Sequence, residues 1–433
     1  MAMAKCTRRQ TMVAIGQLNQ KGGRRVPILK YAQRWVPLGV IVLYLTVTGS
    51  ALADTTLSEY VEATFVRHQG RELSQSERDI ANALDQKAAQ PLAGDPTFNL
   101  KYETDAIGSD LGYREWEGGV ELPLWSPGQS REYKREAGRT MSVADATLNA
   151  RRLEVAGKVR DRLWMLALAR GELEQAQSAL QIAQGLADDV KRRVDAGELP
   201  RSDLLLADKD VLTRTDAVAQ AENRVAQAEG VFRNFTGLES ALIPQWEPIP
   251  ANRELPENHP QLVLVDAKVE LASAHRDRVE GERHSGPNVW LGGKTFKEQS
   301  GAGYDSAVGI EVSIPFGSVA HAAPALAKAG AALTEAQVER EHSHHQLAEA
   351  LYIATLEYER TTEAQQRAQR RQELAEASLD ISRRAFELGE IDLVRLLQVQ
   401  ADAIDARHDQ QIRQLDVGQA IARLNQSLGV IPQ

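Results

Sequence analysis

The sequence holds a single cysteine, Cys6, in a basic N-terminal segment that we expect to be removed. The rest of the chain therefore has no disulfide, no thiol nucleophile and no zinc-thiolate site, and no cysteine that could carry a lipid anchor at the cleavage point. Catalytic sequence motifs are also missing, since there is no P-loop, no G-x-S-x-G and no H-E-x-x-H. We therefore predict no enzymatic activity and no cofactor.

Long hydrophobic runs are missing too. After residue 53 no apolar run approaches the ~18 residues of a membrane-spanning helix, so any membrane crossing is expected to use strands. Positive charge is also in short supply, because the formal net charge of −9 becomes −17 when the eight basic residues before residue 54 are removed. This acidic balance argues against nucleic acid as a partner.

Residues 1–53 have the composition of a signal peptide. Their eight basic residues, with no acidic one, are followed by an apolar run at 35–47 and by Ala51-Leu52-Ala53, a small-x-small site that predicts cleavage before Asp54. An uncleaved membrane anchor is the alternative, although the run is shorter than a span of ~20 residues. A start codon placed too early would explain the long basic part.

The chain repeats itself at a constant offset. VELPL at 120–124 returns as VSIPF at 312–316, and GEL at 197–199 returns as GEI at 389–391, each 192 positions later. Short matches in one register indicate a duplication. We predict a first structural repeat at 54–238, a proline-rich linker at 239–258 and a second structural repeat at 259–433.

Both repeats have the same order of expected elements: a helical lead-in, two short strands, a very long helix, a tight turn and a returning helix. The lead-ins are at 57–86 and 260–282, the long helices at 128–195 and 325–388, and the returning helices end at Gly237 and Gly429. In the first long helix apolar residues recur at the gaps of a coiled coil: Val159, Leu163, Leu166, Leu173, Ala176, Leu180, Ala183, Val190 and Val194. The predicted fold class is mainly α with a small β part.

The expected strands alternate between apolar and polar residues. In 98–103 and 308–314 nearly every second residue is apolar, so one face of each strand is apolar. Aromatic residues stand at or near strand ends, as in the girdles of transmembrane barrels: Tyr102, Trp116, Trp125, Trp290, Tyr304 and Phe316. A half-buried soluble sheet is the alternative, but the chain has little other apolar sequence to cover it.

The number of expected strands calls for assembly. Four strands per chain are fewer than the roughly eight of the smallest transmembrane barrels, and open strand edges are not tolerated in lipid. The narrow apolar seams of the long helices need neighbours as well. Both features predict a ring of copies, in which strands close a barrel and helices close a cylinder.

The order of elements, the duplication and several short segments resemble the TolC-like outer-membrane efflux proteins. These segments are the turns RVDAGEL (193–199) and AFELGEI (385–391) and the helix ends NFTG (234–237) and NQSLG (425–429). The resemblance, which covers about 54–430, implies a homotrimer with a β-barrel in the outer membrane of a Gram-negative bacterium and a helical tunnel in the periplasm. It also implies an efflux or type I secretion channel that docks with a periplasmic adaptor and an inner-membrane pump.

The same resemblance implies that the two helix turns are the tunnel mouth and the adaptor contact. The residues concerned are Gly197, Glu198, Asp203, Gly389, Glu390, Arg395 and Gln398. Family members carry carboxylates after the second turn, where this chain has Arg395 and Gln398. We therefore hypothesise that Asp203 and Arg395 form an ion pair that breaks when the channel opens; a plain connecting turn is the alternative.

One histidine cluster is a candidate metal site. The resemblance includes a branch for cobalt, zinc and cadmium resistance, and imidazoles bind such ions. However, only His342 and His345 are i,i+3 neighbours on a helix. We predict a solvated face without a metal, with these two residues as the remaining candidates. A non-porous periplasmic coiled-coil adaptor or scaffold is the alternative function, although tandem hairpins and strand pairs disfavour it.

Overall fold

The computed structural model describes residues 56–68, 70–238, 246–283, 286–316 and 319–432. The predicted signal peptide at 1–53 and the first part of the predicted linker, 239–245, lie outside these residues. Residues from Leu52 onward form one unit. None of its described helices is both long and apolar enough to cross a membrane.

The described elements follow a similar order in the two parts of the chain. The first part contains α1 (Leu57–Arg67), α2 (Gly70–Ala89), β1 (Thr97–Thr104), β2 (Arg114–Pro123), α3 (Gln129–Asp195) and α4 (Arg201–Thr236). The second contains α5 (Pro260–Gly281), β3 (Asn288–Lys297), β4 (Asp305–Ser313), the short 3-10 helix η1 (Val319–His321), α6 (Ala323–Glu387) and α7 (Leu393–Ser427). The predicted fold class, mainly α with a small β part, is confirmed.

The structure corrects the single lead-in helix predicted at 57–86 to the two helices α1 and α2. The buried side chains of Tyr60 and Phe65 belong to α1, which packs against α3 and α4. The helix ends at His68, whose Nε2 lies 2.9 Å from the carbonyl oxygen of Phe235 at the end of α4. Because α1 is held against the end of α4, the helix is interrupted before α2 begins.

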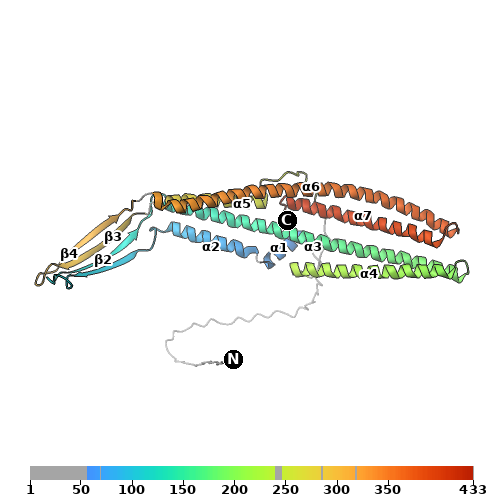
Figure 1. The fold of residues 1–433 in the computed structure, drawn as a ribbon, viewed down its shortest axis with the longest axis horizontal. Helices are drawn as coiled ribbons and strands as arrows, with labels where there is room; N and C mark the ends of the chain where they lie inside the picture. The colour runs from blue at the N-terminus through green and yellow to red at the C-terminus, as the bar shows by residue number, and fades with distance from the viewer. Residues whose placement is uncertain (1–55, 69, 239–245, 284–285, 317–318, 433) are drawn as a thin grey trace, which may run out of the picture. The chain divides into compact units, whose positions relative to one another are not determined.

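Two long helices organise the helical part. α3 has 67 residues and α6 has 65, which corresponds to about 100 Å each at 1.5 Å per residue. Away from the sheet, α4 packs on α3, α3 on α7 and α7 on α6 (Figure 1). Nearer the sheet, α2 and α5 occupy the corresponding places beside α3 and α6. The α3 seam is buried at Val159, Leu163, Leu166, Ala183 and Val190.

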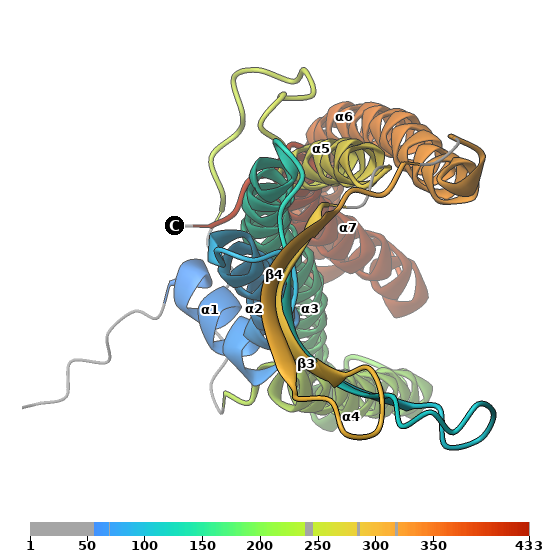
Figure 2. The same cartoon turned by 90° about the vertical axis from the view of Figure 1, so that its left-hand side faces the viewer.

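The four strands form one antiparallel sheet in the order β1-β2-β3-β4. The two strand pairs therefore join through β2 and β3. In this central pair Gly118 and Gly119 lie opposite Gly293 and Gly292, and glycines of this kind allow a strand to bend. Figure 2 shows the resulting strong curvature. Among the described residues β1 and β4 are each paired on one side only, which leaves two open edges.

Candidate functional site

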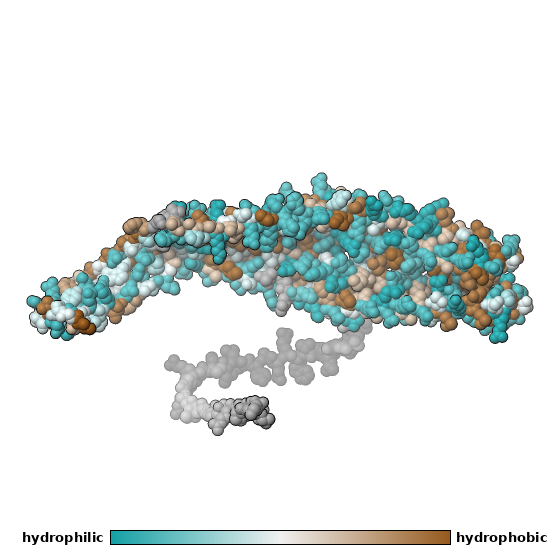
Figure 3. Space-filling view, viewed as in Figure 1, coloured by the Kyte–Doolittle hydropathy of each residue, from teal (hydrophilic) through white to brown (hydrophobic). Residues whose placement is uncertain are grey.

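The cross-strand register gives the sheet an apolar face. One row across all four strands consists of Phe98, Val120, Leu291 and Ile310, and the row beside it contains Leu100 and Val308. These side chains are largely uncovered, since Phe98 is 69% and Val308 94% exposed. Hydrophobic residues are visible over the strands in Figure 3. A contiguous exposed apolar face indicates contact with lipid or with another apolar surface.

The opposite face of the sheet is polar. It carries Asn99, Lys101, Glu103, Glu115, Glu117, Glu121, Lys294 and Glu311. Part of this charge is paired within the sheet, because Lys101 lies 2.7 Å from Glu103 and Lys294 lies 3.3 Å from Glu115. The alternation predicted from the sequence therefore yields two faces of different chemistry.

The aromatic residues predicted as a girdle occupy different places. Tyr102 and Trp116 share the apolar face, with ring centroids 4.4 Å apart. Trp125 lies beyond β2, and its indole N–H donates to the carbonyl of Gln90 at 2.8 Å. The structure contradicts the girdle assignment for Trp290, which lies on the polar face. The reason is strand alternation, since its neighbour Leu291 belongs to the apolar face.

Both helix turns are built in the same way. At the end of α3 the N–H of Gly197 donates to the carbonyl of Val194 and that of Glu198 to Arg193. At the end of α6, Gly389 and Glu390 repeat these two bonds. This is the Schellman motif, and its glycine needs a positive φ, which is 80° at Gly197 and 75° at Gly389.

The two helix turns also pack against each other, a link that is not evident from the sequence. A buried cluster joins the ends of all four helices: Ala187, Val190, Ala207, Leu379, Phe386, Leu393, Leu396, Val399 and Ala403. The Arg193 guanidinium stacks over the Phe386 ring at 4.9 Å and also pairs with Glu198 at 3.3 Å. The cluster therefore holds the two hairpin tips together within one chain.

The structure does not form the hypothesised ion pair within one chain. Arg395 donates from Nη1 to Gln398 at 3.3 Å, and its backbone N–H donates to Asp392, which caps α7. Asp203 accepts from the Ser202 hydroxyl at 3.3 Å. Among the described residues no contact joins Asp203 to Arg395, because each side chain bonds a neighbour in its own first helical turn.

The histidine cluster on α6 gains no further ligands. His342 Nε2 lies 2.8 Å from the Gln346 amide nitrogen, and the rings of His344 and His345 lie edge to face at 6.1 Å. In the part of the chain that the structure describes, no group of three His, Cys, Asp or Glu side chains could hold a metal ion. His342 and His345 therefore stay only sequence-based candidates.

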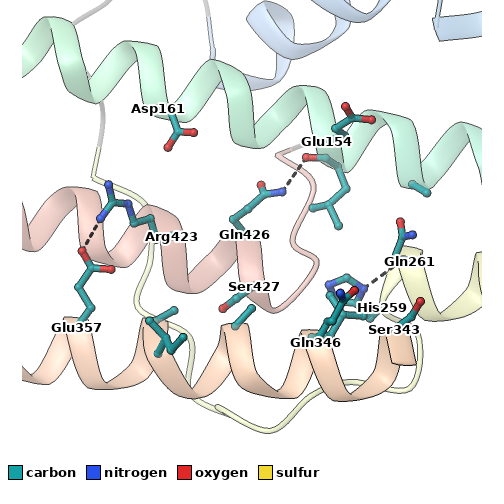
Figure 4. Close-up of a pocket in the computed structure, with 16 residues that line it drawn as sticks. Glu154, Asp161, His259, Gln261, Ser343, Gln346, Glu357, Arg423, Gln426 and Ser427 are labelled. Atoms are coloured by element: carbon teal, nitrogen blue, oxygen red, sulfur yellow. Dashed lines mark hydrogen bonds and ion pairs between the residues drawn. The ribbon is translucent and has the colours of Figure 1, made fainter. Parts of the chain in front are cut away.

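A cavity of about 750 Å³ lies in the middle of the helical part, where α7 ends and α5 begins. Figure 4 shows α3 and α6 on either side of it. His259, only 2% exposed, lies at its border. Its Nδ1 accepts from the backbone N–H of Gln261 at 3.2 Å, while Nε2 has no hydrogen-bond partner in the described structure. Burial lowers the pKa of His259.

Beside this cavity a buried ion pair ties the linker to the helices. Arg160 on α3 is 3% exposed and donates to both carboxylate oxygens of Glu247 at 2.8 and 2.7 Å. Arg160 also donates to Gln426 at 2.6 Å and to the Val430 carbonyl at 3.1 Å. Asn425 completes the network by donating to Glu247 and to the carbonyl of Pro248. Sequence patterns cannot reveal such pairs, because their members are far apart along the chain.

Comparison with known proteins finds a family match for part of the chain. Residues 67–238 match the outer membrane efflux protein family. The match covers 172 of the 433 residues, and over this part the predicted resemblance to outer-membrane efflux proteins is confirmed. The predicted location in the outer membrane, with the helical part in the periplasm, agrees with this match. No match exists among curated protein sequences.

Solved structures agree with this fold. The outer membrane protein VceC from Vibrio cholerae is 14% identical, with a TM-score of 0.66 over 86% of this chain and 96% of VceC. The outer membrane channel MtrE from Neisseria gonorrhoeae, in its open state, is 14% identical, with a TM-score of 0.65 over 87% of this chain and 89% of MtrE. CusC, a transmembrane channel, is 14% identical, with a TM-score of 0.68 over 87% of this chain and 92% of CusC. At these identities the likeness concerns the fold alone.

Proposed function

We propose that this chain forms a homotrimeric efflux duct and is the outer-membrane component of a tripartite system. The observation that carries the proposal is the sheet, which has two open edges and one exposed apolar face. An open edge in lipid leaves backbone groups unpaired at a cost of several kcal/mol each. Three copies supply twelve strands, enough for a closed barrel, whereas one copy supplies four.

The helices support the same assembly. Large apolar side chains remain exposed on α4 and α6, the outer helices of the half that contains the tips, and at the C-cap of α6. They are Leu205 and Leu212 on α4, Leu374 and Ile381 on α6, and Leu388 at the cap. In a closed ring α4 of one copy would face α6 of the next copy and cover these residues. The helices would then line a tunnel that continues the barrel, and cargo would pass along the polar inner surface.

The tips are the proposed mouth of the tunnel and the contact for a periplasmic adaptor, which in turn docks with an inner-membrane pump. The residues proposed for this role are Gly197, Glu198, Asp203, Gly389, Glu390, Arg395 and Gln398. A gate that uses Asp203 and Arg395 would have to pair them between copies. Arg395→Glu should then change the single-channel conductance and the susceptibility of cells to the cargo, and an unchanged conductance would count against this gate.

The assembly can be tested by native mass spectrometry of the detergent-solubilised protein together with planar-bilayer recordings. We expect a mass of three mature chains and discrete single-channel steps. The protein should remain in the outer-membrane fraction after cell lysis. A monomer that stays dissolved without detergent and gives no conductance would overturn the proposal and would favour the non-porous adaptor or scaffold.

A further inference from the structure

The polar face of the sheet carries one row in which, among the described residues, no carboxylate pairs with a cation. This row runs across all four strands and consists of Thr97, Glu121, Trp290 and Glu311. It lies near the helical end of the sheet, since β2 ends at Pro123 and β3 begins at Asn288. We call these four residues the tryptophan row. It places one large aromatic ring between two carboxylates on the face that lies opposite the apolar one.

The ring of Trp290 packs over glycines of the neighbouring row. The row next to the tryptophan row contains Gly119, Gly292 and Gly309. A Cβ added at Gly119 or Gly292 would overlap the indole, and one at Gly309 would lie 3.5 Å from Cζ3. The indole therefore covers backbone where any other residue would place a side chain. This position against the sheet keeps the large ring from projecting far outward.

The tryptophan row contains no cationic side chain that would neutralise its two carboxylates. Glu121 accepts from the side-chain amides of Asn288 at 2.9 Å and Asn99 at 3.5 Å, which leaves its charge in place. Glu311 is exposed, and no cationic side chain of the described residues pairs with it. Towards the far end of the sheet, in contrast, Lys101 and Lys294 pair with carboxylates.

We propose that the tryptophan row is the charge-selecting row of the pore. The inference rests on the proposed function, because copies must close so that the polar face lines the lumen. Each copy would then add the carboxylates of Glu121 and Glu311 to one ring, and rings of carboxylates favour cations. Low-dielectric walls around a charged lumen strengthen this preference. The Trp290 ring adds a π-face, which also attracts cations.

The selectivity can be measured as a reversal potential in a KCl gradient across a planar bilayer. We expect cation preference in the natural protein and a several-fold lower K⁺/Cl⁻ permeability ratio in Glu121→Gln/Glu311→Gln. Glu298→Gln removes a carboxylate outside the strands and serves as the control, with little expected change. Since glutamine keeps the shape and polarity of glutamate, the row should remain assembled.

Two tryptophans on opposite faces provide a second matched comparison. Trp290→Ala should raise the single-channel conductance, whereas Trp116→Ala on the apolar face should leave it unchanged. Gly292→Ala should lower the conductance, because its Cβ forces the indole off the sheet into the lumen. That effect should disappear in Gly292→Ala/Trp290→Ala. If Trp290→Ala fails to insert, Trp290→Leu keeps an apolar side chain at this position for the same comparison.

The outcomes separate the inference from the proposed function. If no variant, including the natural protein, forms channels, the proposed duct fails. If channels form but the double glutamine variant keeps its reversal potential, the charge-selecting row is wrong. Equal conductances of Trp290→Ala and Trp116→Ala would likewise contradict a lumenal position of Trp290.

Discussion

The ends of α4 and α7, here called the first and second joint, are related by the duplication but are packed differently. At the first, the end of α4 is covered by α1, whose Tyr60 and Phe65 are buried against neighbouring helices. At the second, the end of α7 is tied to the linker by Arg160 and Glu247 and borders an open cavity. Both ends keep a glycine with positive φ, Gly237 and Gly429.

The difference teaches which part of each repeat is constrained. The long helices and their glycine stops recur, since they set the length of the wall and the position of the turns. The contacts that hold the joints do not recur. Apolar packing at the first joint and a buried polar network at the second can both hold the ends of the shorter helices. The first joint should therefore respond to loss of side-chain volume and the second to loss of charge.

The largest effects are expected at the two joints, and the first test addresses the polar one. Arg160→Ala removes both bonds to Glu247 and the bonds to Gln426 and Val430, and it leaves a carboxylate largely buried without its partner. Loss of one member of a buried pair costs about 3–5 kcal/mol. Chemical unfolding of the detergent-solubilised protein should show this loss. Arg253→Ala, which breaks the exposed pair with Glu359, should cost at most about 1 kcal/mol.

At the apolar joint the matching test is Phe232→Ala. Phe232 is 1% exposed, and its ring meets Tyr60 edge to face at 5.5 Å. Loss of a buried phenylalanine side chain costs about 3–5 kcal/mol, through the lost burial of the ring and the cavity that remains. The same unfolding assay should show this decrease. Ile107→Ala, at a fully exposed loop position, serves as the control, and equal stabilities of the two variants would contradict the role of this joint.

A smaller effect is expected where α7 approaches α3. A Cβ at Gly418 on α7 would overlap the ring of Trp164 on α3. Overpacking of this kind costs about 1–3 kcal/mol, so Gly418→Ala should lower the melting temperature. Gly185→Ala is the matched control, because nothing lies within 4 Å of its Cβ, and alanine should stabilise this helix by up to about 1 kcal/mol. Similar shifts at both sites would show that α3 and α7 are not in close contact.

The smallest effect concerns pH at the polar joint. Burial lowers the pKa of His259 below its ordinary value of 6.5, so the unfolded chain binds this proton more readily than the folded chain. Stability is therefore retained above about pH 6.5 and falls as the pH decreases from there through the folded pKa. His259→Asn keeps an acceptor for the Gln261 N–H and should weaken this decrease in a pH series of unfolding curves. The exposed His344→Asn should not.

Much of this architecture follows from local sequence. The absence of proline from residues 129–195 and the spacing of Val159, Leu163 and Leu166 predict a long packed helix, and glycines predict both tips. The face occupied by Trp290 was also within reach, because its parity relative to Leu291 fixes it. The contacts at the polar joint could not be predicted from the sequence. Arg160 and Glu247 are brought together only when the linker crosses α3, and no periodicity reports such a contact.

The most direct test addresses the open edges of the sheet, which are predicted to pair between copies. Cys6 is the only natural cysteine, so cysteine pairs can be introduced cleanly as Leu100→Cys or Phe98→Cys on β1 with Val308→Cys or Ile310→Cys on β4. Within one chain these strands are about 14 Å apart at ~4.8 Å per strand, too far for a disulfide. We therefore predict that at least one pair gives a covalently closed ring of three chains after oxidation in the outer membrane. The absence of cross-linked chains for every pair, with the protein present in that membrane, would contradict the duct.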